Sequence, residues 1–142
     1  MPGVLSSYIG RIKGRLVSAT VGLVESAQVF DFDSVPASIM DKNYRLVTKA
    51  AQQILQEKMS ALYRTEPDVE IFIALKFPAK GSRTAKYMAA VDLNEVIESE
   101  LVAEFPPGTQ PIFELKGFET SEYKDNYLII LFRCHLTYWP TI

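Results

Sequence analysis

The sequence is poor in the residues on which disulfides, metal sites and basic nucleic-acid surfaces depend. Its 142 residues include one cysteine and one histidine, which excludes an internal disulfide and a cysteine-rich zinc site. Fifteen basic against 17 acidic side chains argue against an overall basic nucleic-acid binder, though not against a local basic patch. Apolar runs such as Leu128–Phe132 are far shorter than the roughly 18–20 residues of a spanning helix. We therefore expect no cofactor, no metal and no membrane partner.

What the chain does contain is typical of a globular domain. Apolar residues make up 48% of the sequence and charged residues 23%. The length falls within the range of about 100–150 residues that one domain usually occupies, and it suffices to bury a core without covalent cross-links. No apolar segment of the kind found in signal peptides follows the basic residues near the N-terminus. We expect a single domain over residues 1–142.

The second half of the chain has the clearest patterns. Apolar residues recur with a period of two in 69–77, 112–119 and 127–139, and this period predicts three strands. In 127–132 both faces are apolar, so we expect this half of the last strand to be buried on both sides and the other half on one side. Residues 92–105 carry an apolar stripe at helical spacing, with Asp92 as the expected N-cap. These elements predict an α+β fold: a mainly antiparallel sheet of about four to five strands with helices packed against it.

The first half is harder to interpret. Residues 4–17 have helical spacing of apolar side chains, and 29–32 and 38–40 have the composition of short strands. The segment 44–63 predicts a helix because its apolar residues form one stripe. Its first residues, 44–47, could instead form an edge strand, so the sequence leaves open whether this segment is one helix or a strand followed by a helix.

Two pairs of side chains invite a chemical interpretation. Cys134 and His135 could be a nucleophile and its base, but neighbours on a strand point to opposite faces and cannot hydrogen-bond. We expect Cys134 in the core and His135 half-exposed. Asp31 and Asp33 could hold a cation, but no third oxygen ligand is suitably spaced, so the sequence predicts no metal site and no catalytic residues.

Two other kinds of function remain as alternatives. A small ferredoxin-like enzyme would need four polar side chains to converge in one pocket: Glu66, Asp68, Arg133 and His135. An RNA-binding or adaptor domain would stack bases on strand aromatics: Phe72, Phe113 and Phe118. Core residues flank Phe72, and the usual RNA-recognition signatures are absent from the sequence.

Charges of opposite sign occupy adjacent stretches of the chain. The only charged residues in 77–91 are three cations: Lys80, Arg83 and Lys86. The charged residues of the stretch 92–104 are all acids, and they include Glu95, Glu98 and Glu100. A positive loop on one copy could meet a negative helix on the next, which is a head-to-tail contact of the kind that forms rings. We predict that these six residues lie at an inter-subunit contact.

Four stretches resemble phage tail terminator proteins of the lambda minor-tail-protein-U type. The residues Asp33-Ser-Val-Pro-Ala37 precede an early strand, and Glu70–Ala79 contains a central strand that ends in Phe-Pro-Ala. The helix 92–105 follows, and a closing hairpin runs from Gly117 to Tyr138. The helix predicted at 46–63 is a departure, because it lies where the family pattern has strands.

The resemblance implies a structural role without catalysis. Members of this family form a hexameric ring that ends the tail tube and joins the tail to the head. The implied partners are other copies of the chain, the tail tube protein and a head-completion or connector protein, with DNA only passing through the lumen. The implied location is the virion, assembled in the host cytoplasm. We further expect the N-terminal segment 1–19 to pack on a neighbouring chain.

Overall fold

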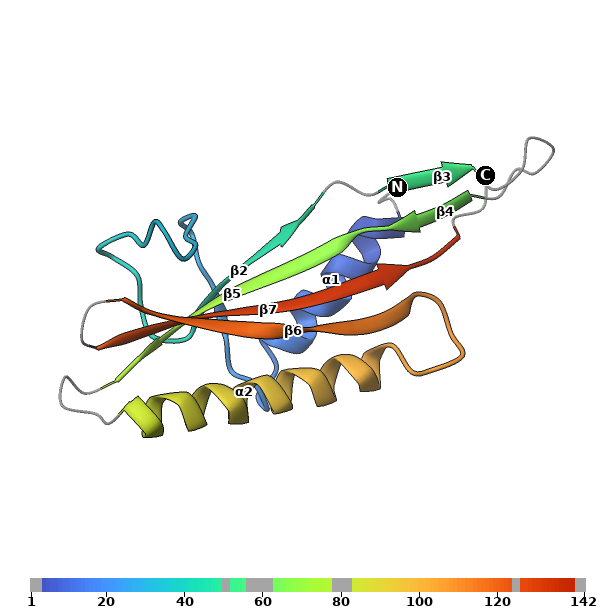
Figure 1. Cartoon of the computed structure of the whole chain (residues 1–142). Coiled ribbons are helices and arrows are strands. Elements are labelled where there is room, and N and C mark those ends of the chain that lie inside the picture. The colour runs from blue at the N-terminus through green and yellow to red at the C-terminus, as the bar shows by residue number, and fades with distance from the viewer. Residues whose placement is uncertain (1–3, 50–51, 56–62, 78–82, 124–125, 140–142) are drawn as a thin grey trace.

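The computed structural model describes residues 4–49, 52–55, 63–77, 83–123 and 126–139. These described residues form two helices, α1 (Val4–Leu16) and α2 (Arg83–Glu104), and seven strands (Figure 1). The strands are β1 (Val24–Glu25), β2 (Asn43–Thr48), β3 (Gln52–Leu55), β4 (Tyr63–Glu66), β5 (Asp68–Lys76), β6 (Ile112–Tyr123) and β7 (Tyr127–Thr137). The fold is α+β, as the sequence predicts.

Five strands form one sheet in the order β1-β2-β5-β7-β6, and β3 pairs with β4. The pairing is antiparallel throughout except between β1 and β2. Both helices contribute to the apolar core on one face of the sheet, where Ile12 and Leu16 of α1 meet Ile97 and Leu101 of α2. We call this the helix face and the opposite one the outer face.

The central strands β5 and β7 are buried on both sides. On β5, Ile71 and Ile73 belong to the core of the helix face, while Phe72 and Ala74 belong to a second core on the outer face. Residues 128–132 of β7 are all buried, which confirms that this half of the strand is enclosed on both sides. Continuous apolar sequence is what such doubly covered strands require.

The irregular segment between β1 and β2 covers the outer face of the sheet and completes the second core there. Phe30 and Ile39 are buried there against the outer face, and Phe30 meets Phe72 edge to face. The strands predicted at 29–32 and 38–40 are therefore wrong. The segment is instead a covering loop, because the Asp31 carboxylate accepts the backbone N–H groups of Asp33 and Ser34 and thereby forms a turn.

The helix predicted over 44–63 is wrong in the described parts of that segment. Residues 43–48 are β2 and residues 52–55 are β3, while residues 56–62 lie outside the described residues. Tyr44 and Leu46 join the helix-face core and Val47 joins the outer core. This alternation fits a strand, and pairing with the buried strand β5 outweighs the helical spacing. The alternative of a strand at 44–47 is confirmed.

Other element boundaries differ from those predicted. Helix α2 begins at Arg83, nine residues before the expected Asp92, so Asp92 lies inside the helix and is not its N-cap. The reason is that the buried stripe of the helix extends back through Ala90 to Lys86. Strand β6 continues past its predicted end at residue 119 to Tyr123, and β7 ends at Thr137, before its predicted end at residue 139. The paired part of the hairpin therefore extends closer to the connecting loop than predicted.

Because β7 is buried on both sides, truncation of an isoleucine to alanine should lower the free energy of unfolding more on β7 than on the edge strand β6. Ile130→Ala should lower the free energy of unfolding by about 2–5 kcal/mol, because Ile130 is fully buried. The matched change Ile112→Ala on β6 should cost about 0.5 kcal/mol, since Ile112 is 45% exposed. Urea titration followed by circular dichroism measures both. Equal losses would contradict the described packing.

Candidate assembly surface

Strands β3 and β4 continue the hairpin of β2 and β5 beyond the main sheet. Thr48 pairs with Val69 and, further along, Gln52 pairs with Glu66, so the β2–β3 side holds one extra residue between these pairs. Proline 67, which has no N–H group, separates β4 from β5. Figure 1 shows β3 and β4 at the end of the sheet opposite the start of α2. We call this ribbon the arm.

The arm is attached to the sheet through β7. Thr65 forms an isolated bridge with Tyr138, in the same register in which Asp68 pairs with His135. Two backbone hydrogen bonds connect Thr65 and Tyr138, at 2.9 and 3.1 Å. The Leu136 N–H also donates to the Pro67 carbonyl. The base of the arm is therefore fixed by backbone contacts across Pro67.

Polar side chains cluster on the outer face beside this base. The His135 Nδ1 lies 2.7 Å from an Asp68 carboxylate oxygen, and its Nε2 lies 3.7 Å from Glu66. The ring thus links β7 to β5 and to the arm. Glu66, Asp68 and His135, three of the four residues that an enzyme pocket would need, therefore lie close together. Both of these contacts of the imidazole are with carboxylates.

The fourth residue, Arg133, points to other partners on the same face. Its guanidinium lies 3.1 Å from Glu119 and 3.5 Å from Glu70, whose carboxylate also lies 3.7 Å from the Lys49 ammonium. These contacts form a row of charge pairs that runs from Lys49, which follows the end of β2, across β5 and β7 to β6. A hollow of about 390 Å³ here is lined by Asp68 and Arg133 and also by Lys49, Val69, Glu70, Lys116 and Cys134.

Cys134 is buried, as predicted, on the helix face. Its side chain belongs to the core cluster with 1% exposure, while the neighbouring His135 lies on the outer face. Burial, followed by the charge of Asp68, raises the pKa of the Cys134 thiol to about 12. The thiol is therefore neutral near pH 7 and has no access to the imidazole beside it in sequence.

The three rings on which an RNA-binding domain would stack bases, Phe72, Phe113 and Phe118, do not all lie on one face of the sheet. Phe72 is buried under the covering loop, in edge-to-face contact with Phe30 and Phe32. Phe113 and Phe118 are partly buried against the core of the opposite, helix face. Bases stack on exposed rings, so this arrangement offers no continuous platform from these three residues.

The residues of the predicted inter-subunit contact lie mostly on one helix. Arg83 and Lys86 fall in the first turn of α2; Arg83 lies 3.3 Å from Glu122 of β6, and Lys86 is buried with 7% exposure. Lys80 lies outside the described residues. Farther along α2, Glu95 is exposed, Glu98 is half-buried, and Glu100 is paired within the chain.

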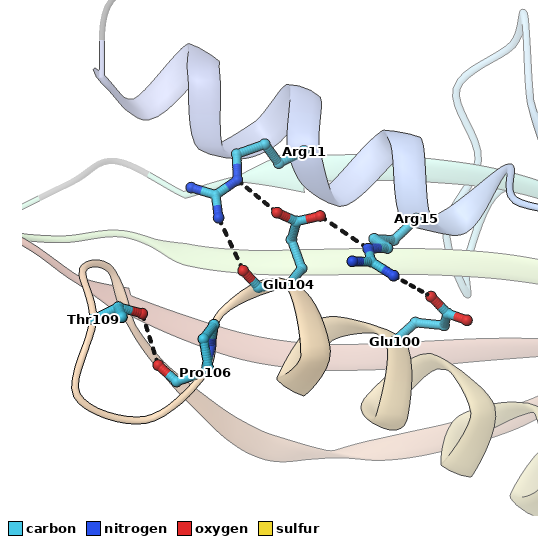
Figure 2. Close-up of polar contacts among 6 residues, drawn as sticks. All are labelled: Arg11, Arg15, Glu100, Glu104, Pro106 and Thr109. Carbon is cyan, nitrogen blue, oxygen red and sulfur yellow. Dashed lines mark hydrogen bonds and ion pairs between the residues drawn. The ribbon is translucent and has the colours of Figure 1, made fainter.

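Two arginines of α1 hold the C-terminal end of α2 (Figure 2). The Arg11 Nε lies 2.8 Å from one Glu104 carboxylate oxygen and the Arg15 Nε lies 2.9 Å from the other. Arg15 also bonds Glu100 at 3.0 Å, and Arg11 donates to the Glu104 backbone carbonyl at 2.9 Å. We call these four residues the helix clamp.

The clamp shifts the ionisation of its members. Hydrogen bonds from Arg15 and then Arg11 hold the pKa of Glu104 below its ordinary value. Hydrogen bonds to Glu104 and then Glu100 raise the pKa of Arg15. The contact to the Glu104 carbonyl also satisfies one of the acceptors that a helix leaves unpaired at its C-terminus.

The clamp was not anticipated from the sequence, although a signal was present. Arg11 and Arg15 are four residues apart, and so are Glu100 and Glu104, so each pair occupies one face of its helix. Acids at a helix C-terminus oppose the helix dipole and need compensation by cations. Because of the clamp and the buried Ile12 and Leu16, α1 packs on its own chain.

An apolar groove lies where α2 ends and β6 begins. It has a volume of about 470 Å³, and Val102 and Ile112 on its walls are 42% and 45% exposed. The turn at its rim is closed by the Thr109 hydroxyl, which donates to the Pro106 carbonyl at 2.7 Å (Figure 2). The remaining lining residues are Phe105, Pro107, Gly108, Gln110, Phe113 and Trp139.

Two further properties concern only the part of the chain that the structure describes. There, no three His, Cys, Asp or Glu side chains are grouped so that they could hold a metal ion. In the same part, neither helix is long and apolar enough to cross a membrane.

The helix clamp predicts an acid-sensitive contribution to stability. Glu104→Gln should lower the free energy of unfolding by up to about 1 kcal/mol at pH 7. Because the folded state lowers the pKa of Glu104, its contribution is present above the ordinary value of 4.5 and is lost as pH falls through the folded value. The wild-type and variant stabilities should therefore converge in acid.

Urea titrations from pH 7 to pH 2 measure this convergence. Glu95→Gln is the matched control, because it makes the same chemical change at an exposed position of the same helix. Its stability should follow that of the wild type at every pH. A constant difference between Glu104→Gln and the wild type down to pH 2 would contradict the role of the clamp.

Burial of the one cysteine predicts a protected thiol. At pH 8 the native chain should react with a thiol reagent at least about a hundredfold more slowly than the chain in denaturant, because burial blocks access and disfavours the thiolate. Absorbance of the released reagent follows the reaction. Equal rates in the two states would place Cys134 at the surface.

A scan against models of known protein families finds no match, and neither does a search of curated proteins. Function is therefore inferred from the geometry of the chain and from the resemblance of its sequence pattern.

Proposed function

We propose that the chain is a structural subunit that assembles with copies of itself into a ring. The observation that carries this proposal is the arm. A two-stranded ribbon is at best marginally stable by itself in water. In the described residues, the backbone bridge between β4 and the main sheet is the pair Thr65–Tyr138, and the Glu66 side chain of β4 also contacts His135 of β7. A partner surface on another copy would stabilise the arm.

The apolar groove supports the same proposal. Its exposed walls offer the apolar contact that charge pairs alone do not supply. The groove is built from the end of α2 and the start of β6, so it is a different surface from the arm. Contacts between two different surfaces repeat from copy to copy, and they close into a ring when the rotation between copies permits.

The resemblance to tail terminator proteins gives the ring a role. We propose that it ends the tail tube in the virion after assembly in the host cytoplasm, and that it joins the tail to the head. Its partners would be the tail tube protein and a head-completion or connector protein. We propose a hexamer with a lumen through which DNA passes.

We also propose that the chain is not an enzyme. Cys134 and His135 lie on opposite faces of the sheet, and the buried thiol has its pKa raised to about 12, which supports this proposal. The His135 ring is directed to two carboxylates rather than to a nucleophile. Its contacts favour a structural role, in which it connects the base of the arm to β5.

Mass measurement in solution combined with electron microscopy tests the proposal. The wild-type chain should form rings of uniform size as its concentration rises, and these should limit the length of tubes grown from the tail tube protein. A monomer at every concentration, both alone and with the tube protein, would overturn it.

A groove variant sharpens this test. Val102→Asp should weaken ring formation by about tenfold or more, because it places a charge on the exposed apolar wall. Val29→Asp is the matched control, since Val29 is 68% exposed and lies on the covering loop, away from the groove. Both variants should keep the wild-type circular dichroism spectrum. Equal assembly of the two would remove the groove from the interface.

A further inference from the structure

The main sheet has an open edge along β2. Strand β1 pairs with Asn43 and Tyr44 alone in the described residues, so it covers only the start of β2. The Ser26 N–H donates to the Tyr44 carbonyl, which shows that Tyr44 turns its backbone groups toward the β1 side. Because backbone direction alternates along a strand, Leu46 and Thr48 turn the same way, beyond the end of β1.

The opposite edge of the sheet is β6. Across the described residues, β6 pairs with β7 and no other strand. The Leu136 N–H donates to Pro67, so even-numbered residues of β7 face the β5 side and odd-numbered ones face β6. His135 and Thr137 pair with Glu114 and Ile112. The backbone groups of Phe113 and Leu115 are therefore directed away from the sheet.

A bulge limits the regular part of this edge. The register shifts between Leu115 and Gly117, and Gly117 has a φ of 125°, which only glycine adopts readily. The first part of β6, residues 112–115, is the straight segment that another strand could join. Ile112 and Leu115 are 45% and 36% exposed there, and the apolar groove adjoins this segment.

The two edges carry opposite charges. Residues 43–49 contain Arg45 and Lys49 and no acid. Strand β6 contains Glu114, Glu119 and Glu122 against one cation, Lys116. The Lys49 and Glu114 side chains are 62% and 51% exposed, so both can reach a neighbouring molecule. This complementarity favours contact between the two different edges over contact between two identical ones.

Strand direction is compatible with such a contact. β2 runs antiparallel to β5, β5 to β7, and β7 to β6, so β2 and β6 run in opposite directions. A second copy that continues the sheet in the same orientation would therefore present its β6 antiparallel to β2. Antiparallel addition of a strand to an open edge is a common mode of protein association.

We propose that the open edge of β2 in one copy pairs with residues 112–115 of β6 in the next copy, so that the sheet continues around the ring. This inference rests on the proposed ring function and names the surfaces that meet. The twist between neighbouring strands rotates each copy relative to the last, which allows the series to close.

Charge exchange between two variants tests the pairing. Lys49→Glu alone and Glu114→Lys alone should each associate about tenfold more weakly at low salt, because each places like charges across every contact. An equimolar mixture of the two should recover assembly, since alternating copies restore an opposite pair at each contact. The chain carrying both changes should recover it as well. Lys76→Glu, at an exposed position of the central strand β5, is the control and should assemble like wild type.

Hydrogen exchange of the wild-type ring gives a second measurement. The amides of Leu46, Thr48, Phe113 and Leu115 should exchange at least about tenfold more slowly in the ring than in the dilute monomer. Rings that form without this protection, or single variants that assemble like Lys76→Glu, would overturn the edge pairing while leaving the ring itself intact. A wild-type chain that never assembles would overturn both proposals.

Discussion

The pairing of β5 with β7 is the constraint on which the rest of the fold depends. Nine residue pairs join Asp68–Lys76 to Tyr127–His135, and most of these residues are buried on whichever face they point to. Each face therefore needs a cover: the two helices on one side and the loop with Phe30 and Ile39 on the other. The outer cover is incomplete, and the charged row around Glu70 and Arg133 occupies the remainder.

The helix clamp decides which surfaces are left for other molecules. Helix α2 has two cations in its first turn and two acids, Glu100 and Glu104, near its end, which is the reverse of what its dipole favours. Arg11 and Arg15 compensate the acidic end, and in doing so they hold α1 against its own chain. Among the surfaces that the clamp leaves uncovered in the described residues are the strand edges, the arm and the groove.

These surfaces lie at different sides of one sheet, and this arrangement supports the proposed self-association in a ring. The long hairpin of β2–β3 and β4–β5 continues past the main sheet, and Pro67 interrupts its ladder where the arm begins. The proposed contact uses the opposite edges β2 and β6, whose charges differ in sign. Salt dependence is therefore expected of assembly more than of folding.

The sequence by itself determined the elements whose apolar pattern is unambiguous: the strands around Ile73 and Ile130, the helix through Ile97, and the burial of Cys134. It left Tyr44–Thr48 open between a helix and a strand, because the apolar residues fit both and only the pairing with β5 decides between them. Only the tertiary structure placed Phe30 over Phe72, because the covering loop has no repeating pattern of apolar residues from which its packing could be predicted. It also brought Arg15 to Glu104, 89 residues away, because such a contact depends on how the two helices pack.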